Sequence, residues 1–162
     1  MNRNLILIVS AFVFLSCNSN EVYNMYFPIE NHEWHSKNKI EFVFENIDTI
    51  SKNNIFINIR NTKSYEYSSL FLIAKIEFPS GLTVIDTLEY EMADPSGNWL
   101  GSGLTDLKEN KLFYKERVMF PEMGNFEISI QHATRGINDI EGVNPLKGIS
   151  DVGLSIEQLK NE

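Results

Sequence analysis

Hydrophobic and polar residues alternate along most of this chain in short runs. Ile40, Phe42 and Phe44 fall on one face of an extended segment, with acidic residues on the other. A period of two is typical of a β-strand with one buried face. The same signal recurs in seven segments, namely 40–44, 55–59, 70–78, 84–92, 112–120, 126–130 and 152–156. The pattern therefore predicts an all-β chain.

Turn-forming residues separate these runs at 52–54, 79–81, 94–98 and 121–124. Many short strands with such turns predict an antiparallel β-sandwich of about seven to eight strands. The pairing order does not follow from the pattern, so immunoglobulin-like and jelly-roll-like arrangements both stay open. The almost continuously apolar run 70–78 is interpreted as a central strand covered on both faces.

The N-terminus has the features of an export signal. Arg3 precedes an apolar run over 5–15 that is too short to span a bilayer but fits a signal peptide. The run ends at Phe14-Leu15-Ser16-Cys17, which resembles a bacterial lipobox with a small residue before the modified cysteine. We therefore expect lipidation of Cys17; an ordinary signal peptide with an incidental thiol is the alternative.

These features predict three segments. Residues 1–16 form a lipoprotein signal peptide, 17–33 a lipidated N-terminus with a flexible tether, and 34–162 the β-sandwich domain. The tether is inferred because the residues after Cys17 are polar and show no clear periodicity.

Charge and composition narrow the function further. The chain has 162 residues, a net charge of −8 and one cysteine, which excludes an intrachain disulfide. Removal of the signal peptide, which contains Arg3 and no acidic residue, changes the charge to −9. Such a surface argues against nucleic-acid binding and repels anionic headgroups, so we expect membrane attachment through lipid.

The search for catalytic or metal-binding motifs predicts no catalytic residue, no metal and no cofactor. His32 and His35 are three residues apart, whereas a zinc-protease pair needs four, so a surface pair is the better reading. Oxygen-bearing side chains in the segment 94–106 suggest a calcium loop, but Asp94-Pro95 is also an ordinary turn opener.

Two tryptophans suggest an alternative function. In a β-sandwich, an exposed Trp34 or Trp99 would offer a platform on which sugar rings stack, which would make the protein a carbohydrate-binding envelope lipoprotein. The competing interpretation is structural, because glycines on both sides of Trp99 allow the backbone to approach a large ring closely.

Three groups of residues resemble the gliding-motility lipoprotein GldH family of Bacteroidota. They are Arg60-Asn61-Thr62 with Tyr65-Glu66-Tyr67, Asp86-Thr87-Leu88-Glu89 with Gly97-Asn98-Trp99-Leu100-Gly101-Ser102-Gly103, and Ile140-Glu141-Gly142-Val143 with Ile149-Ser150-Asp151-Val152-Gly153-Leu154. The resemblance covers nearly all of the chain after the signal peptide.

The resemblance implies a non-enzymatic accessory protein of the cell envelope. Its expected partners are other envelope proteins of the gliding and linked type IX secretion machinery, and its lipidated position corresponds to Cys17. Only one acidic residue occurs in Asn18-Ser19-Asn20-Glu21, whereas the surface-export signal is an acidic cluster. We therefore expect attachment to the periplasm-facing leaflet of the outer membrane.

Overall fold

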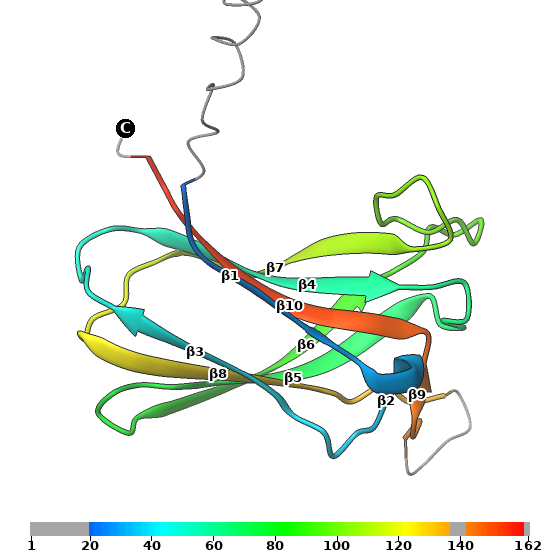
Figure 1. Ribbon diagram of the computed structural model, residues 1–162, viewed down its shortest axis with the longest axis horizontal. Coiled ribbons are helices and arrows are strands. Elements are labelled where there is room, and N and C mark those ends of the chain that lie inside the picture. Colours follow the sequence, from blue (N-terminus) through cyan, green and yellow to red (C-terminus); the bar gives the residue numbers. More distant parts are fainter. Residues whose placement is uncertain (1–19, 137–141, 161–162) are drawn as a thin grey trace, which may run out of the picture.

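Two four-stranded antiparallel sheets pack against each other in this protein (Figure 1). The computed structural model describes residues 20–136 and 142–160. The first sheet has the order β1 (Glu21–Pro28), β10 (Ile149–Gln158), β4 (Asn53–Asn61) and β7 (Lys108–Val118). The second sheet has the order β3 (Ile40–Asn46), β8 (Gly124–His132), β5 (Ser69–Glu77) and β6 (Thr83–Glu91).

The strand order is that of a jelly roll. Successive long strands change sheet at every step except from β5 to β6, which form a hairpin within the second sheet. The remaining elements are a short 3₁₀ turn, η2 (Glu30–His32), and a two-stranded ladder of β2 (Glu33–Trp34) and β9 (Leu146–Lys147). The predicted all-β sandwich is confirmed, and the jelly-roll alternative is the one observed.

The core lies between the two sheets and is made by the predicted alternation. Ile55, Ile57 and Ile59 of β4 are fully buried and face the second sheet's Phe42 and Phe126, which are also fully buried. Burial of such side chains stabilises a fold by about 1.5–3 kcal/mol each. The alternation therefore sets which face of each strand points inward.

The prediction for the apolar run 70–78 is wrong in one respect. β5 lies inside its sheet between β8 and β6, but its burial alternates strictly along the strand, so only one face is covered. β4 and β10 are instead buried almost throughout. Their inner faces pack against the second sheet, and side chains such as Tyr26 lie over the outer face.

The prediction of a flexible tether up to residue 33 is also wrong. β1 begins at Glu21 and pairs along its length with β10, so the sandwich starts only four positions after Cys17. β1 is an edge strand with mostly exposed side chains, and this explains its polar sequence. The signal peptide and Cys17 lie outside the described residues, and no helix in the described part is long and apolar enough to cross a membrane.

Candidate interaction surface

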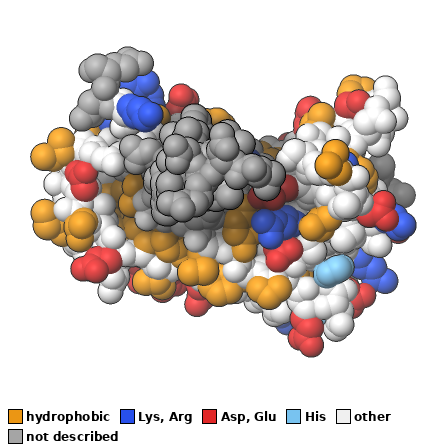
Figure 2. All heavy atoms as spheres, turned by 45° about the horizontal axis from the view of Figure 1, so that its top comes forward, with side chains coloured by type: hydrophobic (Ala, Val, Ile, Leu, Met, Phe, Trp, Pro, Cys, Tyr) orange, Lys and Arg blue, Asp and Glu red, His pale blue; other side chains and the backbone are white. Residues whose placement is uncertain are grey.

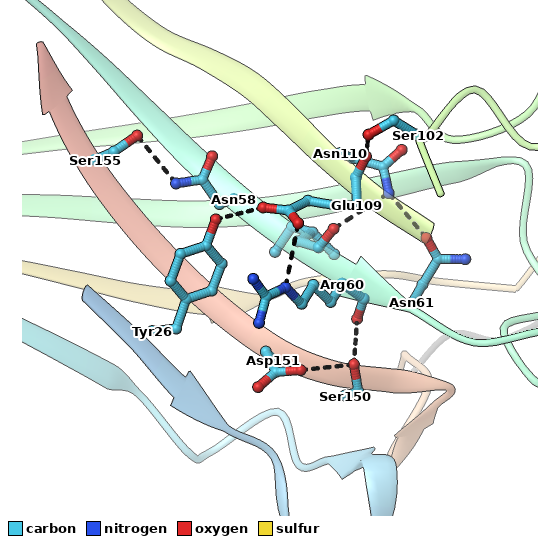
Figure 3. A network of polar contacts seen from close by, with 11 residues as sticks. Tyr26, Asn58, Arg60, Asn61, Ser102, Glu109, Asn110, Ser150, Asp151 and Ser155 are labelled. Carbon is cyan, nitrogen blue, oxygen red and sulfur yellow. Dashed lines mark hydrogen bonds and ion pairs between the residues drawn. The ribbon is translucent and has the colours of Figure 1, made fainter. Parts of the chain in front are cut away.

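The outer face of the first sheet carries an ordered network of polar and aromatic side chains (Figure 3). Cross-strand register places Tyr26 opposite Gly153, and Gly153 opposite Asn58. The next row places Asp151 opposite Arg60, and Arg60 opposite Glu109. Side chains directly opposite one another on one face of an antiparallel sheet are the pairs that interact.

Gly153 makes room for the ring of Tyr26. A Cβ at this position would lie 2.7 Å from Tyr26 Cδ1, which is closer than any real side-chain contact. The ring therefore lies across the backbone of β10 and reaches the charged pair on β4 and β7 (Figure 3). A glycine inside a strand often marks such a close approach.

Tyr26, Arg60 and Glu109 bind one another. The Tyr26 hydroxyl donates to Glu109 Oε1 at 2.6 Å, Arg60 Nε lies 3.4 Å from Glu109 Oε2, and the Arg60 guanidinium carbon lies 4.2 Å from the Tyr26 ring centroid. Burial, followed by the hydrogen bond to Glu109, raises the pKa of Tyr26 well above its ordinary value. The phenol therefore stays protonated and acts as a donor.

Neighbouring buried polar groups are also paired. Asn58 Nδ2 donates to Ser155 Oγ at 3.0 Å, and Asn110 Nδ2 donates to Asn61 Oδ1 at 2.8 Å. Buried amides are costly without such partners. Asn61 and Asn110 lie on the inner face of the sheet, whereas Asn58 and Ser155 lie on the outer face. Because the polar side chains of the outer face are engaged with one another, this surface fits a contact face better than a site of proton transfer.

The other end of this face is apolar and cationic. Phe56 packs on Phe113 with ring centroids 4.4 Å apart, and Lys111 Nζ lies 4.2 Å from the Phe56 centroid. Phe113 keeps 54% of its side chain exposed, while Phe56 keeps 6%. Phe113 is therefore the part of the pair that is open to another molecule.

The two tryptophans pack against the core, Trp34 fully and Trp99 in part. Trp34 is 1% exposed, and its indole N–H donates to the Asn38 carbonyl at 2.9 Å. Trp99 is half-buried against the core, with its ring 5.8 Å from that of the buried Tyr65. Their arrangement supports the structural interpretation of both residues.

The three histidines differ in exposure to solvent. His32 and His35 are exposed, whereas His132 is buried beside Trp34, with ring centroids 5.3 Å apart. Burial lowers the pKa of His132, which favours the neutral ring. Among the described residues, no three His, Cys, Asp or Glu side chains gather where they could hold a metal ion.

The oxygen-rich loop is built as a turn. The Asp94 carboxylate accepts hydrogen bonds from the backbone N–H groups of Ser96 and Asn98 and from the Asn98 side chain. These bonds, led by the Asn98 side chain, lower the pKa of Asp94. Asp106 pairs instead with Lys63 at 2.9 Å, so it does not join Asp94 and Asn98 in a shared oxygen site.

No chemical motif in the sequence indicates the cluster of Tyr26, Arg60 and Glu109. Arg60 and Gly153 do occur within the stretches that carry the family resemblance. The available signal was Gly153 itself, a glycine inside an otherwise apolar strand. Tyr26, which packs on Gly153, lies in the segment 17–33 that the sequence predicts to be a tether.

Comparison with solved structures gives distant likenesses. A structure of infectious bursal disease virus, Gx strain, matches with a TM-score of 0.39 and 14% identity over 86% of this chain and 33% of that chain. A subviral particle of the VP2 protein of the same virus matches with a TM-score of 0.30 and 14% identity over 88% of this chain and 43% of that chain. The chain thus spans less than half the length of these structures, and the likenesses support no statement on function.

Comparison of sequences gives near relatives. The "Gliding motility lipoprotein GldH homolog" of Christiangramia forsetii is 47% identical over 96% of this chain and 95% of the relative. The "Gliding motility lipoprotein GldH" of Flavobacterium johnsoniae is 42% identical over 94% of both chains. The family described as GldH lipoprotein matches residues 21–156, from the start of β1 to nearly the end of β10. This chain therefore belongs to the GldH lipoprotein family.

Proposed function

We propose that this chain is a lipid-anchored cell-envelope protein that serves gliding motility as a non-catalytic interaction module. The observation that carries the proposal is the similarity to two proteins named as gliding motility lipoproteins, which extends over at least 94% of the chain. The fold supports a contact role, because polar side chains on the outer face of the first sheet are paired with one another.

The finer assignment has three parts. The anchor is Cys17, the membrane is the outer membrane at its periplasm-facing leaflet, and the partners are envelope proteins of the gliding and type IX secretion machinery. The long connection 92–107 between β6 and β7 is our candidate partner contact. It exposes Leu100, Leu104 and Leu107 at the end of the sandwich where β1 ends.

Deletion of the gene with complementation tests the functional assignment. Cells without the protein should lose colony spreading and show reduced export of type IX substrates, and the intact gene should restore both. Normal spreading and normal secretion in the deletion strain would contradict the proposal.

Photo-crosslinking in living cells tests the partner contact. A crosslinking residue at Leu104 should give adducts with envelope proteins, whereas the same residue at Ile85, which is 64% exposed on β6, should not. Equal adducts from both positions would argue against a specific contact at the connection.

A further inference from the structure

The end of the sandwich opposite to the connection 92–107 exposes several large hydrophobic residues. It consists of the connections 47–52, 78–82 and 119–123, which link β3 to β4, β5 to β6 and β7 to β8 (Figure 1). The exposed fractions are 77% for Ile47, 83% for Ile50, 59% for Leu82, 55% for Met119 and 68% for Met123. Exposed apolar residues gathered in this way mark a contact surface.

This apolar end is also where the described chain enters and leaves the fold. The Gln158 N–H donates to the carbonyl of Asn20, and the Leu159 N–H donates to the carbonyl of Lys52, each at 2.8 Å. Asn20 is thus one strand away from the connection that carries Ile47 and Ile50. Figure 2 shows hydrophobic side chains at the left end of the molecule, where these connections lie in Figure 1.

The distance from Asn20 to a lipid on Cys17 is limited by covalent geometry. Three residue steps separate the two positions, and an extended chain advances at most about 3.6 Å per residue, so the gap is at most about 11 Å. Because β1 replaces the expected tether, the body of the sandwich cannot move far from a membrane in which Cys17 is anchored.

Both acidic residues of these three connections accept hydrogen bonds from neighbouring residues. The Asp48 carboxylate accepts hydrogen bonds from the backbone N–H groups of Ile50 and Ser51, and the Glu122 carboxylate accepts from Ser80. Both acids are therefore engaged within the connections, while Ile47, Ile50 and Met123 beside them remain exposed. An apolar hollow of about 240 Å³, lined by Val22, Ile47 and others, adds to this surface.

We propose that the end formed by 47–52, 78–82 and 119–123 lies on the lipid bilayer that holds Cys17, with Ile47, Ile50 and Met123 inserted at the interface. This inference rests on the lipid anchor in the proposed function. It places the partner-facing connection 92–107 away from the membrane, at the far end of the molecule.

Fluorescence of the purified lipoprotein in vesicles tests this orientation. A lipidated Cys17 has no free thiol, so a cysteine introduced by Ile50→Cys is the sole site for an environment-sensitive dye. In vesicles of phosphatidylcholine, which has no net charge and does not repel the acidic protein, the dye at position 50 should shift its emission to the blue and be quenched by nitroxide lipids. Met123→Cys, on a different connection, should behave in the same way.

Leu104→Cys is the matched control, since Leu104 is also an exposed aliphatic residue in a connection but lies at the other end. Its dye should report water and escape quenching. Unquenched dye at positions 50 and 123 of the lipidated protein would overturn the orientation alone. A blue shift only in native membranes would also overturn it, because a protein would then cover this end.

The unsubstituted chain distinguishes failure of the anchor from failure of the orientation. If it takes up dye, Cys17 is a free thiol, and both the anchor and the orientation are overturned. If it takes up none and floats with the vesicles, the result at position 50 decides the orientation by itself.

Discussion

Tyr26 and Gly153 form the tightest side-chain arrangement on the outer face of the first sheet. We expect Gly153→Ala to displace the Tyr26 ring, because the added Cβ would lie 2.7 Å from it, and to break the bond from Tyr26 to Glu109. Overpacking of this kind costs about 1–3 kcal/mol of unfolding free energy. Urea unfolding of the two proteins measures the difference.

The same substitution in a Tyr26→Ala background is the control. With the ring absent, Gly153→Ala should cost little or even stabilise β10, because alanine loses less backbone entropy than glycine on folding. Equal destabilisation in both backgrounds would show that the ring is not the cause.

His132 makes stability depend on pH. Both ring nitrogens are buried, and this burial outweighs the opposing effect of the nearby Trp34 backbone and lowers the pKa of the His132 imidazole in the folded state below its usual 6.5. Below that value the unfolded chain takes up a proton that the folded chain resists, so the free energy of unfolding should fall as the pH falls. At a pH above 6.5, the imidazole is neutral in both the folded and the unfolded state, and His132 no longer lowers the free energy of unfolding.

His132→Phe isolates this effect. Thermal unfolding measured from about pH 7.5 down to about 5.5 should show a smaller loss of stability in the variant than in the parent. The phenyl ring keeps the packing against Trp34 and has no proton to gain. Parallel curves for the two proteins would contradict the assignment to His132.

At the level of elements, alternation in the sequence locates most strands but not their arrangement. The runs at 40–44 and 55–59 correspond to β3 and β4, because each strand has a core-facing row of apolar residues. The edge strand β1 escaped detection, although Tyr23, Met25 and Phe27 do alternate along it. Its other face also carries Tyr26, which packs on Gly153 of β10, and this contact cannot be inferred without the pairing order.

Buried and exposed positions in the strands should respond differently to truncation. Ile57→Ala on β4 removes a fully buried side chain between the sheets and should lower the free energy of unfolding by about 2–5 kcal/mol. Ile85→Ala on β6 removes a side chain that is 64% exposed and should change stability by less than about 0.5 kcal/mol. Equal effects in urea unfolding would contradict the assignment of the core.

For the whole molecule, the fold places the start of β1 at one end and the long connection 92–107 at the other. The jelly roll brings Asn20, Gln158 and the β3–β4 connection together at one end, while the connection 92–107 lies at the opposite end. The sequence predicts a lipidated Cys17 followed by a tether, whereas β1 already begins at Glu21. The distinction matters, because a lipid on Cys17 would hold a sandwich that starts at Glu21 close to the membrane.

Metabolic labelling with an alkyne fatty acid tests the central claim, that Cys17 carries the lipid that holds this module in the envelope. The wild-type protein should take up the label and lack residues 1–16, whereas Cys17→Ala should take up none and fail to restore spreading to a deletion strain. An unlabelled wild-type protein with a free Cys17 thiol, or full spreading with Cys17→Ala, would contradict the account.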